Sequence, residues 1–384
     1  MTFSSLYSGK LVLAPMVRSG EIPTRLMALK YGADLVWSPE IVDKKLIKCE
    51  RVVNEPLGTI DYLEKGGNTK FPGKSNLVFR TLPRKEKGKL IFQLGTANPE
   101  LAVKAAKIVA GDVDGIDLNA GCPKPFSTHS GMGAALLSTP DLLESILKEL
   151  VTNVGDSYKI PISVKIRLLD DKDSKPTVDL VHRLCKTGIS NLTLHCRTRD
   201  MRNRQSPIRT FLPDIIEACR SHKVNFIING ALRNRVEFEE FQNTYGEDIG
   251  GMIAEGAECN PTCFSHKPLP WNQVIPEFIS IAQSVDNYPG NTKYILLNQL
   301  PGKSPFYQKF AQCKSHEQLM EISNTVGEVG NKVLQKYLTK DVLLNPEQEQ
   351  TDEPKKSSPE SKRGTEHLDS FPQKKQKLEA TQVA

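Results

Sequence analysis

Several apolar, β-branched runs of this 384-residue sequence end on side chains that can take part in chemistry. Cys122 follows such a run and lies between Gly121 and Pro123, which place it in a turn beyond the end of a strand. A thiol near its reference pKa of about 8.5 is mostly protonated at neutral pH, so Cys122 can donate a proton. Lys165 closes another apolar run, which argues against an ordinary surface lysine. Polar side chains end or follow further runs: Gln93, Asn119, Arg167, His195 and Asn229.

The runs that carry these residues alternate with segments whose apolar residues recur at helical spacing. Eight runs occur, at residues 10–16, 34–39, 90–94, 115–119, 162–166, 191–195, 225–228 and 250–254. A strand followed by a helix, eight times over, predicts a parallel (β/α)8 TIM barrel that closes near Cys259. An open, doubly wound sheet gives a similar alternation, so both architectures are open at this point. In a TIM barrel the chemistry lies where the strands end, and the residues above would then share one face.

The rest of the chain departs from this alternation in three places. Residues 54–89 hold a Gly-Gly step, a Pro-Gly step and many basic residues, and we interpret them as an insertion, a hairpin, within a catalytic domain of residues 1–260. Over residues 261–344 the apolar spacing is purely helical, which predicts a small all-helical domain. Residues 345–384 contain one aromatic residue among many polar ones, a composition that cannot bury enough surface to order itself, so we expect a disordered tail.

The amino-acid composition limits the class of protein to which this chain can belong. With 38% hydrophobic and 25% charged residues the chain has the composition of a soluble globular protein, and no apolar run approaches the roughly 20 residues needed to cross a bilayer. The first residues lack the order of a secretory signal, and the eight cysteines lie scattered without framework spacing, so we expect a reduced, intracellular protein. The net charge is +6, all of it in the part expected to fold, which fits a polyanionic partner without establishing one.

Seven of the eight runs end in short motifs that occur in order along the chain. They are Ala14-Pro15-Met16, Gln93-Leu94-Gly95, Asn119-Ala120-Gly121-Cys122-Pro123, Lys165-Ile166-Arg167, His195-Cys196-Arg197-Thr198-Arg199, Asn229-Gly230-Ala231 and Ala254-Glu255-Gly256-Ala257. Together they resemble the tRNA-dihydrouridine synthase family, and residues 122–137 resemble its eukaryotic position-20 branch. Any one motif alone would be weak, whereas seven in order are specific. The resemblance covers residues 11–338 and implies a flavin-dependent reduction of uridine in tRNA.

The resemblance implies FMN as the resident cofactor. Pro15, Met16 and Gln93 match positions that support the flat ring or meet its polar rim, and Lys165 matches a cation that stabilises charge near N1 of the reduced ring. The surroundings of the phosphate are matched by His195, Asn229, Gly230, Ala254, Glu255 and Gly256. Many family members carry a basic residue in place of Glu255, so one charged contact to the phosphate is missing here.

The resemblance also implies the reaction. Hydride adds to C6 of uracil, and C5 must then be protonated from the opposite face. Cys122 matches the family's acid, on a loop through residues 124–133 that can close over substrate. A base inside folded RNA must be extruded before it can stack on the flavin. The positions that match substrate-binding residues are Asn119, Arg167, Arg197 and Arg199.

Clusters of basic residues predict where tRNA is held. The loop after the sixth run carries Arg197, Arg199, Arg202, Arg204 and Arg209, and the insertion adds Lys65, Lys70, Lys74, Arg80, Arg84, Lys85 and Lys87. Both clusters can bind phosphates, although an ordinary solvated charge is the better interpretation of any single one. The resemblance assigns the remainder of the tRNA cradle to the helical domain.

Motifs that the sequence lacks indicate which further cofactors and partners to expect. No Gly-x-Gly-x-x-Gly follows a strand, which favours NADPH or NADH as a diffusible reductant that leaves before RNA enters. Cys259 and Cys263 are spaced like half a zinc site without a second pair, so we predict no metal, and no obligate protein partner is evident. Basic pairs at residues 355–356, 362–363 and 374–375 resemble a nuclear import signal, and we expect the protein in cytoplasm and nucleus.

Two other functions are open at this point. A barrel flavoenzyme that reduces a small molecule, related to dihydroorotate dehydrogenase, would not require the arginine cluster or the helical domain. A tRNA-binding chaperone that has lost catalysis would leave Cys122 and Lys165 dispensable, and Glu255 is the one residue that favours it.

Overall fold

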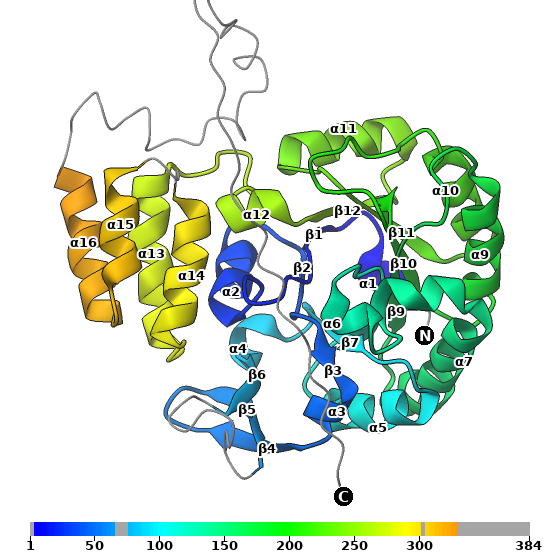
Figure 1. The fold of residues 1–384 in the computed structure, drawn as a ribbon, viewed down its shortest axis with the longest axis horizontal. Helices are drawn as coiled ribbons and strands as arrows, with labels where there is room; N and C mark the ends of the chain where they lie inside the picture. Colours follow the sequence, from blue (N-terminus) through cyan, green and yellow to red (C-terminus); the bar gives the residue numbers. More distant parts are fainter. Residues whose placement is uncertain (1–3, 66–75, 301–303, 329–384) are drawn as a thin grey trace, which may run out of the picture. The chain divides into compact units, whose positions relative to one another are not determined.

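The computed structural model describes residues 4–65, 76–300 and 304–328 (Figure 1). The expected disordered tail at residues 345–384, with its basic pairs, lies outside these residues, and so does the tip of the insertion with Lys70 and Lys74. Among the helices that the structure does describe, none is both long enough and apolar enough to span a bilayer.

Eight parallel strands close into a barrel (Figure 1). They are β1 (Leu11–Leu13), β2 (Leu35–Trp37), β7 (Leu90–Gly95), β8 (Gly115–Ala120), β9 (Ile162–Leu168), β10 (Asn191–Thr198), β11 (Asn225–Asn229) and β12 (Gly250–Ile253). β1 pairs with both β2 and β12, and β2 pairs with β7, so the sheet has no free edge within the barrel. An open sheet is excluded, and the predicted TIM barrel is confirmed.

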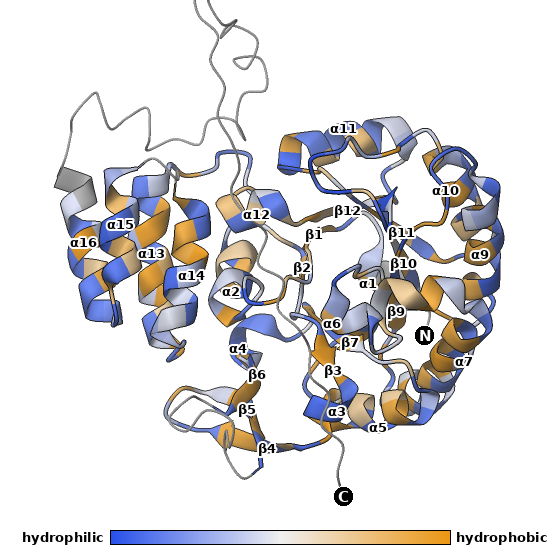
Figure 2. Cartoon of the chain, viewed as in Figure 1, coloured by the Kyte–Doolittle hydropathy of each residue, from blue (hydrophilic) through white to orange (hydrophobic). Residues whose placement is uncertain are grey.

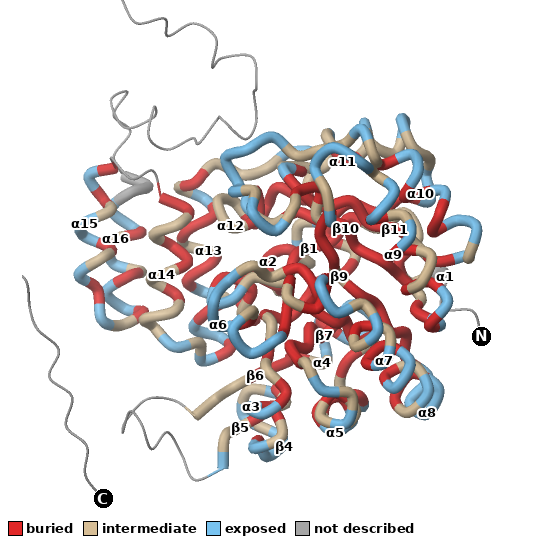
Figure 3. Tube along the Cα trace, turned by 45° about the vertical axis from the view of Figure 1, so that its right-hand side comes forward, coloured by how far each residue is buried: buried red, intermediate tan, exposed pale blue. Residues whose placement is uncertain are grey.

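Helices cover the outside of the barrel. The longer ones are α2 (Ile22–Lys30), α5 (Pro99–Val109), α7 (Pro140–Leu150), α9 (Lys175–Cys185), α10 (Leu212–Ser221) and α11 (Arg235–Tyr245). Proline at the first or second position begins five of these six helices, and the Asn98 and Asn234 side chains cap α5 and α11. Each helix turns apolar residues toward the strands and polar ones outward, and the strands are the most deeply buried part (Figures 2 and 3).

Shorter elements fill the connections. They are α1 (Ser4–Tyr7), β3 (Ile41–Val42), α3 (Asp43–Leu46), α4 (Pro83–Glu86), α6 (Pro125–Thr128), η1 (Gly133–Ser138), η2 (Val151–Gly155), α8 (Asp156–Tyr158) and α12 (Glu255–Cys259). α1 brings Tyr7 under the amino-terminal end of the barrel, where its ring packs in an apolar cluster with Trp37 and Ile91. The polar residues of the strands therefore lie above an apolar floor.

The insertion differs from the hairpin that the sequence predicts over residues 54–89. It is a three-stranded antiparallel sheet of β4 (Cys49–Asn54), β5 (Thr59–Glu64) and β6 (Leu77–Thr81). The first strand begins five residues earlier than expected because Cys49 to Asn54 pair residue by residue with Glu64 to Thr59 around a turn that ends at Gly58, whose φ is +66°.

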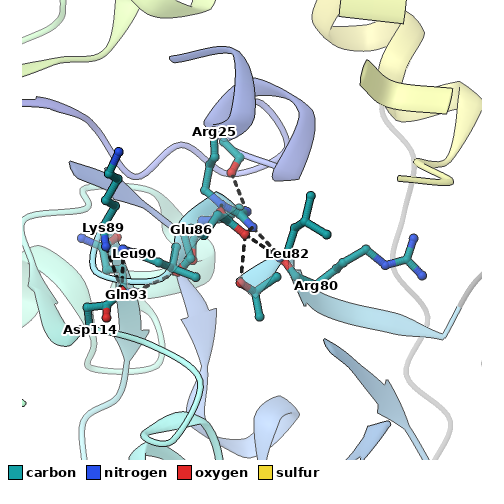
Figure 4. Close-up of polar contacts among 12 residues, drawn as sticks. Arg25, Arg80, Leu82, Glu86, Lys89, Leu90, Gln93 and Asp114 are labelled. Carbon is teal, nitrogen blue, oxygen red and sulfur yellow. Dashed lines mark hydrogen bonds and ion pairs between the residues drawn. The ribbon is translucent and has the colours of Figure 1, made fainter. Parts of the chain in front are cut away.

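A buried polar junction joins this sheet to the barrel (Figure 4). The fully buried Arg25 side chain of α2 pairs with Glu86 of α4 at 2.6 Å and donates to the Arg80 carbonyl at 2.7 Å. Arg80 pairs in turn with Asp61 of β5 and donates to the carbonyl of Val285, the residue after helix α13 (Trp271–Ser284). One chain of hydrogen bonds thus connects the barrel, the insertion and the helices that follow the barrel.

Within residues 261–300 and 304–328 the structure describes four helices after the barrel, where the apolar spacing predicts helices: α13 (Trp271–Ser284), α14 (Pro289–Gln299), α15 (Pro305–Gln312) and α16 (His316–Glu328). They share a hydrophobic core of their own, with the Trp271 ring against Phe306 and Phe310, and their apolar faces turn toward one another (Figure 2). Met27 of the barrel helix α2 belongs to the same core, so the two parts are packed together.

Candidate active site

The strand ends bring most of the candidate residues to one mouth of the barrel. Across the strands, Asn119 lies beside Lys165, and Arg167 lies beside His195, which lies beside Asn229. Side chains at matched positions of neighbouring parallel strands point to the same side of the sheet. The polar set that the sequence singled out is therefore a contiguous ring of side chains above the apolar floor.

The turn that carries Cys122 is fixed by hydrogen bonds. The Asn119 Oδ1 atom accepts the backbone N–H groups of Gly121 at 3.0 Å and Cys122 at 3.1 Å. Ala134 N–H donates to the Cys122 carbonyl at 2.9 Å, and Gly133 has a φ of +59°, where a Cβ would lie 2.6 Å from that carbonyl oxygen. Burial raises the pKa of the Cys122 thiol, so the half-buried side chain is protonated at neutral pH.

Lys165 is a cation without a protein partner. Its side chain makes no hydrogen bond or ion pair with any residue of the described part of the chain, although it rises from the middle of β9 between buried neighbours. Burial, together with the positive charge of Arg167, lowers its pKa to about 8 against the opposing attraction of Asp117. The ammonium group is thus free to bind an anionic or electron-rich group at the barrel mouth.

Gln93 is oriented by a buried carboxylate that sequence reasoning missed. Its Nε2 atom donates to Asp117 Oδ2 at 2.8 Å, and Ser163 Oγ donates to Asp117 Oδ1 at 2.7 Å. Burial raises the pKa of Asp117 to about 6, while the bonds from Gln93 and Ser163 limit the rise. The signal available in the sequence was an aspartate inside the apolar run 115–119, where a charge must have buried partners.

Arg167 and Arg197, which match substrate-binding positions, bind the protein's own backbone. Arg167, 6% exposed, donates to the Gly121 carbonyl at 2.8 Å and to the Thr198 carbonyl at 2.9 Å. Arg197, 4% exposed, donates to the Gln205 carbonyl at 2.7 Å and to the Asn203 carbonyl at 2.9 Å. Both side chains therefore hold the loops after β8 and β10 in place, while Arg199 is exposed.

His195 is neutral in this arrangement. Arg197 Nη1 lies 3.0 Å from His195 Nε2, and a guanidinium group can only donate, so Nε2 accepts and the ring proton is on Nδ1. Burial, with the charges of Lys165 and Arg167, lowers the pKa of His195. The half-buried ring therefore keeps one N–H donor, at Nδ1, that the contact with Arg197 does not use.

Glycines after β11 and β12 allow close contacts with neighbouring parts of the barrel mouth. Gly230 has a φ of +117°, and a Cβ there would lie 3.1 Å from the His195 ring. A Cβ on Gly256 would lie 2.3 Å from the Arg233 carbonyl oxygen, so only glycine allows this contact. The Asn229 side chain ties the two strands together by donating to the Met252 carbonyl at 2.9 Å.

The residues at this mouth of the barrel suit the ring of FMN. Met16 and Ala254 are half-buried and pack against the apolar floor, and Pro15 is half-buried next to Met16, which suits the face of a flat ring. Gln93 and Lys165 supply polar groups at the level of a ring edge. Gly230 and Gly256 pack closely against the His195 ring and the Arg233 carbonyl, so the protein itself fills the space beside their Cα atoms, and the Glu255 side chain is exposed.

Three basic residues predicted to bind phosphates are engaged by other groups of the protein, which corrects that expectation: Arg197, described above, Arg80 and the half-buried Arg209. Arg80 is 8% exposed and paired with Asp61. Arg209 stacks over the Phe241 ring at 4.5 Å and donates to the Gly230 carbonyl at 3.2 Å. Sequence shows a charge but not whether it is buried. The basic side chains that are exposed are Lys65, Arg84, Lys85, Lys87, Arg199, Arg202 and Arg204.

None of the eight cysteines, which all lie in the described part of the chain, forms a disulfide. No cluster of three or more His, Cys, Asp or Glu side chains suited to a metal ion occurs in residues 4–65, 76–300 and 304–328, the neighbourhood of Cys259 and Cys263 included.

The sequence places this barrel in a known class of enzymes. The dihydrouridine synthase (Dus) family model matches residues 12–345, so the chain belongs to that family. It is 54% identical to the tRNA-dihydrouridine(20) synthase [NAD(P)+] of Saccharomyces cerevisiae, over 85% of this chain and 86% of that protein. It is 50% identical to the Schizosaccharomyces pombe protein of the same name, over 77% of this chain and 60% of that one. A human tRNA-dihydrouridine(20a/20b) synthase [NAD(P)+]-like protein is 31% identical over 67% of this chain and 72% of its own length.

Proposed function

We propose that this protein reduces uridine to dihydrouridine at position 20 of tRNA. The single observation that carries the proposal is the turn that holds the protonated Cys122 thiol at the same barrel mouth as Lys165 and Gln93, in a chain of the dihydrouridine synthase family. Position 20 is supported by the 54% and 50% identities to proteins named for that position, against 31% to one named for positions 20a and 20b.

The proposed cofactors are resident FMN and diffusible NADPH or NADH. FMN, when bound, would supply the hydride for C6 of uracil after taking it from the nicotinamide. Met16 and Pro15 would support the ring, Gln93 would donate at its rim and Lys165 would balance negative charge near N1. The residues proposed around the phosphate are His195, Asn229, Gly230, Ala254, Glu255 and Gly256.

The protein's own chemistry is a proton transfer. Cys122 gives its thiol proton to C5, and burial of the thiol keeps it protonated at neutral pH until that step. Asn119 contributes by holding the N–H groups of the turn. Arg167 and Arg197 keep the loops that frame the extruded uracil in place, while Arg199 is free to reach RNA.

The proposed tRNA surface combines the exposed arginines after β10 with helices α13–α16. Arg199, Arg202 and Arg204 are exposed on the loop at the carboxyl end of β10, the end at which the candidate site lies. Tyr288, at the start of α14, is 59% exposed and offers an aromatic surface for RNA. We place the activity in cytoplasm and nucleus.

The test is dihydrouridine formation in an unmodified tRNA transcript that contains uridine at position 20. Mass spectrometry after incubation with NADPH should show dihydrouridine at that position with the wild-type protein and about 100-fold less with Cys122→Ala. Reduction of the bound flavin by NADPH should be unchanged in Cys122→Ala, because the thiol acts after hydride reaches uracil. Cys313→Ala, buried among α13–α16, is the matched control and should retain activity.

Two outcomes would contradict the proposal. Flavin binding and tRNA binding without product from the wild-type protein would reject a synthase and favour the chaperone alternative. Product formation from Cys122→Ala at the wild-type rate would reject Cys122 as the acid.

A further inference from the structure

Glu40 lies against the turn that carries Cys122. It follows β2 and precedes β3, and the Ser127 hydroxyl, from the loop beyond Cys122, donates to its Oε1 atom at 3.2 Å. Space for the carboxyl group is provided by Gly95 at the end of β7, where a Cβ would lie 2.6 Å from Glu40 Oε1. The carboxyl group is therefore built into the barrel mouth from three strand ends.

The second oxygen of this carboxyl group lacks a proper partner. Glu40 Oε2 is buried and accepts no well-formed hydrogen bond from any of the residues that the structure describes. Burial raises the pKa of Glu40, and the polar side chains of Asn119, Ser127 and Cys122 oppose that rise. A Cβ on Gly133 would touch both Ser127 Oγ and Cys122 Cβ, so the hydroxyl that bonds to Glu40 lies beside the Cys122 side chain. A buried carboxylate with an unsatisfied oxygen is costly, and protonation relieves that cost.

The proposed reaction creates a need for a proton at this place. Once Cys122 has protonated C5, it is left as a buried thiolate that must regain a proton before the next substrate. The charged side chains that act on the thiol are Glu40, Arg167 and Lys124. Arg167, with a pKa of about 10, has its donors bonded to the Gly121 and Thr198 carbonyls. The Lys124 side chain is exposed to solvent, so the buried carboxyl group is the donor that remains beside the thiol.

We propose that Glu40 acts through Cys122, by holding the thiol in position and by returning a proton to it after each reduction. The inference rests on the proposed function, in which Cys122 is the acid. The S–H bond of Cys122 breaks as the C5–H bond forms, then the O–H bond of protonated Glu40 breaks as S–H re-forms. The resulting carboxylate takes a proton from water. Glu40 is thus a positioning residue for Cys122 and its proton supply.

The test separates the first turnover from later ones. Full-length, FMN-loaded protein is reduced with one equivalent of NADPH without oxygen and mixed with excess unmodified tRNA, and dihydrouridine is measured over time by mass spectrometry. In Glu40→Gln the amide oxygen can still accept the Ser127 hydroxyl and keep the turn in place. The first turnover should therefore stay within about 3-fold of wild type, because Cys122 starts protonated. With excess NADPH the steady-state rate should fall at least about 10-fold, because reprotonation then limits each cycle.

The pH dependence supplies a second readout. The steady-state rate of the wild type should fall as pH rises through the pKa of Glu40, whereas the slower Glu40→Gln rate should lack that step. Asp43→Asn is the matched control: this buried carboxylate, three residues along the chain, bonds to Thr96 rather than to the Cys122 turn. It should leave both the first turnover and the steady-state rate near those of the wild type.

The outcomes separate the role of Glu40 from the proposed synthase activity. Equal wild-type and Glu40→Gln rates in both phases would overturn the role of Glu40 while leaving the synthase activity intact. An equal loss in the first turnover and in the steady state would overturn the proton supply. No product from the wild-type protein would overturn the proposed function itself, and the inference with it.

Discussion

Asn119 holds Cys122 by a single oxygen: its Oδ1 atom accepts the Cys122 backbone N–H at 3.1 Å and the Gly121 backbone N–H at 3.0 Å. The residue that precedes the turn therefore determines where the thiol lies. In the sequence Asn119 matched a substrate-binding position, and the structure gives it this additional task within the protein.

Asn119→Ala should misplace the thiol. Two buried N–H groups would lose their acceptor, which costs about 1–3 kcal/mol each, and the loop would shift. A displacement on the order of 1 Å can lower a rate by about 100-fold, so dihydrouridine formation should fall 10- to 100-fold. Asn119→Asp keeps the acceptor and should unfold in urea nearly as the wild type does. Similar urea midpoints for both variants would contradict the role assigned to Oδ1.

Lys165 should give flavin reduction a dependence on pH. Its pKa is lowered to about 8 by burial and by Arg167, so the cation is present below pH 8 and is lost as pH rises through that value. Reduction of the bound flavin by NADPH, followed by absorbance, should therefore slow above pH 8. Lys165→Met should reduce flavin roughly 10- to 100-fold more slowly and without that inflection. Lys104→Met, exposed on the outside of α5, is the control and should keep both the rate and the inflection.

The barrel and the ring of strand-end residues were predictable because each run ends in a polar residue at the point where TIM barrels place their chemistry. Which side chains are buried, and which partners they bond to, could not be predicted from the sequence. Asp117 and Glu40 were missed because their roles depend on contacts with Ser163 and Ser127, which lie far away in the chain. Arg80 was assigned to RNA because a sequence shows its charge but not Asp61 beside it.

Asp117 should make the stability of the fold depend on pH. Burial raises its pKa to about 6 from about 3.9 in an unfolded chain. The associated stabilisation is fully present below pH 3.9 and is lost as pH rises through 6, which amounts to roughly 3 kcal/mol. Asp117→Asn, which cannot ionise, should therefore gain about that much relative to the wild type between pH 4 and pH 7. Urea unfolding at several pH values measures the difference, and parallel curves for the two proteins would contradict it.

Removing one partner of the Arg25–Glu86 ion pair should strongly lower the free energy of unfolding. Both side chains are buried, and Glu86 also accepts Thr81 Oγ1 at 2.9 Å and Leu82 N–H at 2.8 Å (Figure 4). Glu86→Leu would leave the buried Arg25 charge without its carboxylate partner and the Thr81 and Leu82 donors without an acceptor, so the free energy of unfolding should fall by about 3–5 kcal/mol.

Arg25→Met should cost less than Glu86→Leu, because Glu86 keeps the bonds from Thr81 and Leu82. The double variant Arg25→Met, Glu86→Leu should lose less than the sum of the two single losses, since no charge is then buried alone. Lys175→Ala, which removes an exposed pair with Asp179, is the control and should change stability by less than about 0.5 kcal/mol.

Arg25 also donates to the carbonyl of Arg80, and the Arg80 side chain donates to the carbonyl of Val285, just after α13. Hydrogen exchange in α13 should therefore rise in Glu86→Leu but not in Lys175→Ala. Additive losses in urea, with unchanged exchange in α13, would show that the pair is not the link between barrel and helices.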